Sequence, residues 1–503
     1  MDRFEVKLNR ELLPASKGER AMGLGGYFAL WVGFAVIIAT FSVGGTGVQA
    51  MTLPLVIVAC IVGNLITGFL ITLNGDVGQE HGIPSPMYWC VIFGPKGSAI
   101  PSVIRGFLAC CWTGIQTYYG ATAIALIIVT LGGNDHWFIC YVIFLAVQIF
   151  NAAFGIKAID RFATIAAPCI IIISIWIVIN LTGQANEAGI DLMHSISVPG
   201  AGIMMSPGGV SFQTFMMVMI TNASYWSTNA ADNQTTQKYV KGPEGEKNFF
   251  KRNKIALCAH LIALPLTQLF CVIIGAVAML TIGDWNPVNA LGSTSKGVLL
   301  LVLLMLVVLA QWSTNIGTSV LPGAVSFQTF VKKLFNKNLP YKAAVIIVGV
   351  IALAVQPWAI MERLTAFLGY MGSVYGPITG IMIADYWVLR KRRLNVPDIY
   401  NENGQFKGAK GWNLAGIIAM ILGVAGGLIF SSYAMFVSIA VGLVVYLILA
   451  KLWWFKSHPQ AEIENNYDDK YLGLTNYNYW QDFVKEHGGT LAADEAEKQQ
   501  QMR

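Results

Sequence analysis

The chain alternates between long runs of apolar residues and shorter polar segments. A transmembrane helix needs about 20 mostly apolar residues, and runs of this kind predict twelve spans. We expect them at about 25–50, 52–74, 100–131, 137–155, 161–183, 208–231, 254–282, 297–321, 342–358, 362–388, 411–431 and 433–455. The pattern therefore predicts an all-α integral membrane protein.

The composition agrees with this interpretation. Of the 503 residues, 55% are hydrophobic and 12% are charged, whereas an ordinary soluble domain has about 25% charged residues. Such a chain is not a cytosolic enzyme, a secreted domain or a disordered protein. The eight cysteines show no C-x-x-C spacing, so we expect neither a zinc site nor a disulfide framework.

Lysine and arginine indicate the orientation. Twelve spans with both termini inside give inner loops at 75–99, 156–160, 232–253, 322–341 and 389–410. Of the 33 basic residues, only Lys296 and Arg363 fall on the outer side, as the excess of positive charge in cytoplasmic loops requires. We therefore expect a protein of the cell membrane with cytoplasmic termini.

The ends of the chain are polar. Residues 1–24 contain no apolar segment of the kind found in a signal peptide, so no cleavable signal is expected. Residues 456–503 are expected to form a flexible cytoplasmic tail.

Two spans contain small and polar residues at membrane depth. Gly44, Gly45 and Gly47 lie in the first span, and the apolar run of the sixth gives way at 221–224. Non-helical backbone is tolerated at this depth where it lines a cavity, and a pair of interrupted helices is typical of inverted-repeat transporters. Glycine-mediated packing of intact helices is the alternative, and the sequence does not favour either.

The third span carries Trp112 near the bilayer midplane and Gln116 one turn later on the same face. An indole can stack on a planar ring, and a carboxamide can bind an amide edge. The pair therefore predicts a site for a planar heterocycle. The alternative is a tryptophan packed between helices and a glutamine that bridges them.

The eighth span places Ser313 and Thr314 side by side, followed by Asn315 and Ser319. Such hydroxyls usually bond to carbonyls of their own helix, but beside a broken first helix they could complete an oxygen cage for Na⁺. The middles of the spans almost lack carboxylates, which argues against a carboxylate proton relay. His260 is the one imidazole within a span, and we interpret it first as a hydrogen-bonded packing residue.

Several motifs occur in order between about residues 9 and 455. They are NRELLPASKGER, FGPKGSAIPSVIRG, WTGIQTYYGA, GDWNPV, QWSTN and GPITGIMIADYWVLRKRR. On these motifs the chain resembles the nucleobase–cation symporter-1 family, and within it the hydantoin and allantoin permeases more than the cytosine permeases. The resemblance implies a leucine-transporter-like 5+5 inverted repeat, residues 25–183 and 208–388, and two further helices in 411–455.

The resemblance also implies a substrate site. Its residues would be Trp112, Gln116, Asn222, Ala223, Ile37, Ser319, Asn315 and Trp226. Ile37 stands where relatives often have glutamine or asparagine, and Ala223 stands where a second stacking aromatic residue is expected. Tyr225 and Trp226 are close enough to compensate if the local register shifts.

The resemblance implies a cation site between the first and eighth spans. The carbonyls of Gly33, Val36 and Ala310 and the hydroxyls of Ser313 and Thr314 would be its ligands. We therefore expect Na⁺ as the coupling ion, with no other cofactor.

The sequence thus predicts a secondary transporter that imports a small planar nitrogenous heterocycle by cation symport, through alternating access. A proton-coupled or uncoupled permease of the same fold is an alternative. An integral membrane enzyme is disfavoured because the six histidines are scattered, and a channel because no filter motif repeats. The partners expected are the heterocycle, the cation and the lipid bilayer, without nucleic acid.

Overall fold

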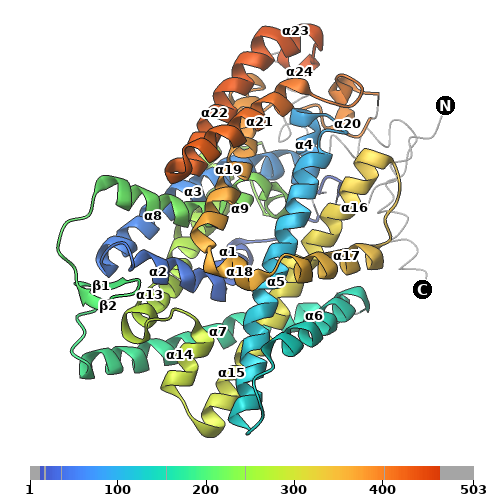
Figure 1. Ribbon diagram of the computed structural model, residues 1–503. Helices are drawn as coiled ribbons and strands as arrows, with labels where there is room; N and C mark the ends of the chain where they lie inside the picture. The colour runs from blue at the N-terminus through green and yellow to red at the C-terminus, as the bar shows by residue number, and fades with distance from the viewer. Residues whose placement is uncertain are drawn as a thin grey trace.

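The computed structural model describes residues 12–15, 18–35, 37–154, 156–243, 245–401 and 403–464, apart from the side chains of 154–167. These residues form a bundle of helices (Figure 1). In the described part of the chain, strands occur only in one antiparallel hairpin, β1 (Ser195–Val198) and β2 (Gly202–Met205), in which Ser195 pairs with Met205. The all-α fold class predicted from the sequence is confirmed.

The first half of the bundle is helical almost throughout. Its elements are α1 (Leu24–Ala35), η2 (Ile38–Thr40), α2 (Phe41–Gly47), α3 (Leu53–His81), α4 (Ser85–Phe93), α5 (Ala99–Thr130), α6 (Trp137–Phe154) and α7 (Ile156–Glu187). The hairpin follows α7, and the Ser197 amide donates to the Val48 carbonyl at 2.9 Å.

The second half also contains both long and short helices. It begins with α8 (Phe212–Tyr225), α9 (Ser227–Asp232), α10 (Gln234–Gln237), α11 (Phe249–Arg252), α12 (Lys254–Cys258), η3 (Ala259–Ala263), α13 (Leu264–Ile282) and α14 (Pro287–Thr294). It continues with α15 (Gly297–Asn315), η4 (Ile316–Val320), α16 (Leu321–Phe335), α17 (Tyr341–Ala354), α18 (Pro357–Glu362), α19 (Leu364–Met382) and η5 (Ile383–Leu389).

The last elements follow η5, and the two long helices among them pack on α19. They are α20 (Val396–Ile399), η6 (Gln405–Lys407), α21 (Leu414–Ile429), η7 (Ser431–Tyr433), α22 (Ala434–Leu449), η8 (Ala450–Trp454), α23 (Phe455–Ser457) and α24 (Ala461–Glu464). The α19, α21 and α22 helices contact one another closely, and Figure 1 shows α21 and α22 beside α19.

Each of the twelve expected spans overlaps a helical segment. By length and composition, seven helices of the described chain can cross a membrane, or eight if α1 and α2 count as one bent span. The α6, α17 and α21 helices are apolar but shorter, and the sixth expected span is divided between α8 and α9. The exact number of twelve stays a prediction.

The first span breaks before its glycine cluster. The α1 helix ends at Ala35, and the following helical segment, Ile38–Gly47, is bent from it by 63°. A Cβ on Gly44 would lie 1.8 Å from the Val272 carbonyl oxygen, so α2 packs backbone to backbone on α13. The span is therefore both interrupted and packed through glycine, at different residues.

The sixth span breaks later than its sequence suggests. The segment 221–224 is α-helical and belongs to the last turns of α8, and the helix is interrupted at Trp226. This interruption brings Tyr225 and Trp226 to the point where α8 and α9 meet.

The expected inner loop at 75–99 is largely helical. The α3 helix continues to His81 because its polar residues have buried partners: Arg252 donates to both carboxylate oxygens of Asp76 at 2.6 Å and lies 3.2 Å from Glu80. Unpaired, these charges would be strongly destabilising in the interior.

A second buried charge network closes the end of the bundle. Arg390, just after η5, is fully buried, pairs with Asp385 at 2.6 Å, and also binds Gln460 and Glu462. The first part of the expected flexible tail, residues 456–464, is therefore packed on the bundle, and the remainder lies outside the described residues.

Candidate functional site

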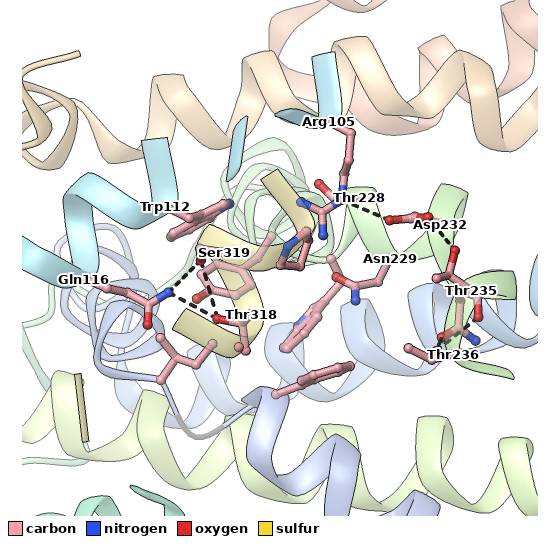
Figure 2. A pocket seen from close by; sticks show the side chains of 17 residues that line it. Arg105, Trp112, Gln116, Thr228, Asn229, Asp232, Thr235, Thr236, Thr318 and Ser319 are labelled. Atoms are coloured by element: carbon pink, nitrogen blue, oxygen red, sulfur yellow. Dashed lines mark hydrogen bonds and ion pairs between the residues drawn. The ribbon is translucent and has the colours of Figure 1, made fainter. Parts of the chain in front are cut away.

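A cavity of about 270 Å³ lies where the two helix breaks meet the third and eighth spans (Figure 2). It is lined by Phe34, Ile37, Arg105, Trp112, Gln116, Tyr225, Trp226, Thr228, Asn229, Asp232, Asn233, Thr235, Thr236, Gly317, Thr318, Ser319 and Pro322. One end, between α5 and the helix breaks, is rich in aromatic side chains, and the other end, along α9 and α10, is polar. Small-molecule sites commonly combine an apolar wall with a few polar groups in this way.

The aromatic end is built around Trp112 on α5. Trp112 is half-buried, and its ring centroid lies 5.2 Å from that of Tyr225 and 5.8 Å from that of Phe367. Trp226 is held in place by a hydrogen bond from its indole N–H to Gln268 at 2.5 Å. The aromatic residues of the second break thus face the tryptophan of the third span.

Gln116 links α5 to the eighth span. Its Nε2 donates to Ser319 Oγ at 3.0 Å and to Thr318 Oγ1 at 3.4 Å, and its Oε1 accepts from Thr314 at 2.9 Å. The wider π-helical turn of η4 carries Thr318 and Ser319, and such turns are frequent at functional sites. The carboxamide is thereby fixed by three hydroxyl groups.

The structure brings together five of the eight residues expected in the substrate site. The cavity is lined by Ile37, Trp112, Gln116, Trp226 and Ser319.

The other three residues are not among those that line this cavity. Asn222 is fully buried, donates to Asn64 at 3.0 Å and accepts from Gln268 at 2.8 Å. Asn315 donates to Gln148 at 2.5 Å in a separate network, and Ala223 is buried in the core.

The expected cation ligands lie on two helices, α1 and α15, that pack mainly against different neighbours. Gly33 is half-buried on α1, which packs mainly against α12, η3 and α13, whereas α15, with Ala310, packs mainly against α5 and α7. Val36 lies outside the described residues. In the part of the chain that the structure describes, no group of three His, Cys, Asp or Glu side chains is placed to hold a metal, so a cation would need carbonyl and hydroxyl oxygens.

One hydroxyl oxygen of the eighth span is available as a ligand. The Ser313 hydroxyl is buried and lacks a hydrogen-bond partner among the described residues. Its neighbour Thr314 donates to the Ala310 carbonyl at 2.8 Å and to Gln116. Buried polar groups are usually hydrogen-bonded. The Ser313 oxygen therefore has an unused lone pair, which a cation could accept as a ligand.

His260 is enclosed and does not line the cavity, but its Nε2 lies 3.5 Å from Nδ2 of Asn233, which does. It is fully buried, with Nδ1 2.7 Å from the Thr72 hydroxyl and Nε2 3.1 Å from the Tyr27 hydroxyl. Both ring nitrogens are thus engaged, which is the geometry of a hydrogen-bonded packing residue.

The polar end of the cavity was not assigned from the sequence. Arg105 on α5 pairs with Asp232 on α9 through Nε and Oδ2 at 2.9 Å, and Thr228 and Asn229 lie beside them (Figure 2). Arg105 precedes Trp112 by seven residues, two helical turns, and therefore shares its face. That spacing was the signal available in the sequence.

Comparison with known proteins identifies relatives over nearly the whole chain. A family model described as permeases for cytosine and purines, uracil, thiamine and allantoin matches residues 14–450. A hydantoin permease of Microbacterium maritypicum is 27% identical over 470 residues, which cover 92% of this chain and 93% of the relative. An allantoin permease of Bacillus subtilis (strain 168) is 25% identical over 490 residues, covering 90% and 94%.

Solved structures share the fold. The inward-facing conformation of Mhp1 matches with a TM-score of 0.81 at 23% identity, covering 94% of this chain and 99% of that chain. A closed conformation of Mhp1, a nucleobase-cation-symport-1 family transporter with bromovinylhydantoin bound, matches with a TM-score of 0.76 at 24% identity, covering 91% and 99%. The fold is therefore the leucine-transporter-like one expected from the motifs.

These findings confirm a multi-pass membrane transporter and not an enzyme, because the relatives are permeases and the matching structures are transporters. The family match covers well over half of the chain. The chain belongs to the nucleobase–cation symporter-1 family, the permeases for cytosine and purines, uracil, thiamine and allantoin.

Proposed function

We propose that the protein imports a small planar nitrogenous heterocycle, of the nucleobase, hydantoin or allantoin type, by symport with Na⁺ across the cell membrane. The relatives named above are permeases for hydantoin and allantoin. The observation that carries the proposal is the cavity at the two helix breaks, with Trp112 and Gln116 on its α5 wall (Figure 2).

The aromatic end suits a planar ring. A ring stacked on Trp112 would lie beside Tyr225 and Trp226, which line the same cavity and give it further apolar contact. An aromatic pair contributes about 0.5–1.5 kcal/mol beyond the area it buries. Gln116 presents one donor group and one acceptor oxygen, which match the alternating N–H and C=O groups of an amide edge.

The hydroxyls around Gln116 allow it to bind without a large rearrangement. Thr318 and Ser319 accept from its Nε2 and also carry rotatable O–H groups. When a ligand binds the carboxamide, these hydroxyls can turn toward the ligand and remain hydrogen-bonded. The free-energy cost of breaking the hydrogen bonds of Gln116 is thereby reduced.

The position of the cavity supports alternating access. From Gln116 the cavity extends to Asp232, Thr235 and Thr236, next to the basic loop that begins at Lys238. On the positive-inside rule this side is cytoplasmic, which supports release of the substrate inward from this end of the cavity. Loading from outside would require the helix bundle to rock against the scaffold helices.

Thr314 supports coupling between the cation and the heterocycle. Its single hydroxyl proton is shared between the Ala310 carbonyl and Gln116 Oε1, an expected cation ligand and an expected substrate ligand. A cation that engages the Ala310 carbonyl would leave this proton to Gln116 alone and so fix the carboxamide. The near absence of carboxylates from the middles of the spans favours Na⁺ over a carboxylate proton relay.

A thermal-shift screen tests the proposal. Purified protein would be heated with purines, pyrimidines, hydantoins and allantoin in matched Na⁺ and K⁺ buffers, and hits would be tested for uptake in proteoliposomes. A ligand at 100 Kd stabilises by about 2.7 kcal/mol. We expect stabilisation by at least one heterocycle, larger in Na⁺, and saturable uptake against a gradient.

Two results would contradict the proposal separately. If no planar heterocycle stabilises the protein or is taken up, the substrate class is wrong. If a heterocycle binds equally in Na⁺ and K⁺, sodium coupling is wrong and a proton-coupled or uncoupled permease replaces it.

A further inference from the structure

The cavity has a polar end that the stacking of a single ring does not explain. Arg105 on α5 reaches into the cavity opposite Thr228 and Asn229 of α9 (Figure 2). Arg105 and Trp112 are seven residues apart on one helix, about 10 Å along its axis. This separation leaves space beyond a ring that is stacked on Trp112.

Several polar groups at this end have unused hydrogen-bonding capacity. Arg105 donates through Nε to Asp232 at 2.9 Å, whereas its Nη1 and Nη2 have no hydrogen-bond partner among the described residues. Within the same residues, the buried Thr228 hydroxyl has none. The Asn229 side chain is half-buried in the cavity wall. Leaving a buried polar group unpaired is unfavourable, so these groups favour a polar occupant.

The charge at this end limits the kind of occupant. Arg105 and Asp232 neutralise each other, because they form an ion pair whose side chains are only 17% and 20% exposed. A carboxylate placed on the free guanidinium nitrogens would also lie near the Asp232 carboxylate and be repelled by it. A neutral carbonyl oxygen accepts the same hydrogen bonds without this repulsion.

The donors and acceptors then define a complementary group. The guanidinium offers donors to a carbonyl oxygen, while Thr228 and the Asn229 amide oxygen can accept from N–H groups. We propose that Arg105, Thr228 and Asn229 form a second subsite, which binds a neutral ureido or carboxamide substituent of the heterocycle that is stacked on Trp112. This inference rests on the proposed function and deepens it, because it names the residues that would hold such a substituent, of which the ureido group of allantoin is one example.

The test compares ligands that differ only in this substituent. Affinities of the purified full-length protein would be measured by calorimetry for hydantoin and its 5-ureido derivative allantoin, and for uracil and uracil-5-carboxamide. Hydantoin-5-acetic acid and uracil-5-carboxylic acid supply the anionic counterparts. We expect the ureido or carboxamide member of at least one pair to bind more tightly than both its parent ring and its acid.

Variants identify the residues. Arg105→Lys keeps a positive charge opposite Asp232 but removes the guanidinium fork, and Thr228→Val removes a hydroxyl at constant shape. One hydrogen bond contributes about 0.5–1.5 kcal/mol net, so each variant should weaken the substituted ligand by about 2- to 12-fold and the parent ring by less than about twofold. Thr130→Val, at the far end of α5, is the matched control, and binding of the parent ring shows that each variant is folded.

The outcomes separate this inference from the proposed function. If parent rings bind but the substituents confer no advantage, or if the variants weaken parent and substituted ligands equally, the second subsite is wrong and the proposed function stands. Tighter binding of the acids would also overturn this inference, since the subsite would then prefer an anionic substituent to a neutral one. If none of the rings binds wild-type protein, both proposals are wrong.

Discussion

At the scale of single residues, Thr314 connects the expected cation site to the expected substrate site. One hydroxyl group connects the Ala310 carbonyl at 2.8 Å to the Gln116 carboxamide at 2.9 Å. Thr314→Val keeps the shape and removes this connection, whereas Thr314→Ser keeps the hydroxyl.

Na⁺ should increase heterocycle affinity in wild type more than in Thr314→Val. We expect the two increases to differ by a factor of about 2 to 12, the contribution of one hydrogen bond. By reciprocity the heterocycle should increase Na⁺ affinity less by the same factor. Calorimetric titrations in Na⁺ and K⁺ measure both effects. Equal loss in Thr314→Ser would show that the hydroxyl is not responsible.

Trp112 is the second residue with a specific expected effect. Trp112→Ala removes the stacking surface and should weaken every ring ligand together, by at least the roughly 2- to 12-fold that 0.5–1.5 kcal/mol of aromatic interaction represents. The measurement is ligand affinity of the folded variant.

Trp137→Ala is the matched control, because Trp137 packs on Tyr118 and Trp358 away from the cavity. It should lower the unfolding temperature and leave affinity unchanged. If Trp112→Ala behaves like this control, Trp112 is only a packing residue and the ring lies elsewhere.

The sequence predicts the candidate site where its residues lie on one unbroken helix, because helix periodicity then fixes which residues share a face. Trp112 and Gln116 are one turn apart on an unbroken helix, so their shared face follows from their spacing. Asn222 and Ala223 were expected to lie in the site, but their orientation depends on where the sixth span breaks. Because α8 continues to Tyr225, it is Tyr225 and Trp226 that line the cavity.

At the scale of elements, the contact between α2 and α13 depends on glycine. A Cβ on Gly44 would lie 1.8 Å from the Val272 carbonyl oxygen, and a Cβ on Gly275 would lie 1.8 Å from that of Phe41. Both neighbours are backbone atoms, which cannot move without shifting a helix.

Gly44→Ala should therefore destabilise the protein by about 1–3 kcal/mol, as overpacking of a core does, and lower the thermal unfolding midpoint. Gly183→Ala is the matched control: Gly183 lies within α7, and an added Cβ would meet no atom within 4 Å. We expect Gly183→Ala to be neutral or slightly stabilising. An equal midpoint for Gly44→Ala and wild type would contradict the close packing.

The sequence predicts an element where a long run of apolar residues is enough to identify a membrane span. The approximate positions of the spans follow from it, since a long apolar run has few other uses. The inner end of α3 was missed because Asp76 and Glu80 resemble loop residues locally. Their partner Arg252 is about 170 residues away in sequence, and no local pattern contains that information.

At the scale of the whole molecule, this same cluster joins the two halves of the chain. Arg252 has two short hydrogen bonds to Asp76 and lies 3.2 Å from Glu80, and all three side chains are buried. Removing one partner of a buried ion pair costs about 3–5 kcal/mol, because an uncompensated charge remains.

Arg252→Met should thus lower the unfolding midpoint sharply, since it leaves two carboxylates together. Adding Asp76→Asn to this variant removes one of these charges and should restore part of the loss. Thermal unfolding in detergent measures both variants. If the double variant is less stable than Arg252→Met alone, charge pairing is not what this cluster contributes.

Arg390 has a consequence for the time course of synthesis. This fully buried guanidinium is translated 72 residues before Glu462, one of its buried partners. At 5–20 residues per second, the ribosome needs roughly 4–14 s to supply that carboxylate. During this interval Arg390, just after η5, can pair only with Asp385, because its other acidic partner has not yet been synthesised. The contact with Glu462 therefore forms only after α21 and α22, which pack on α19, have been synthesised.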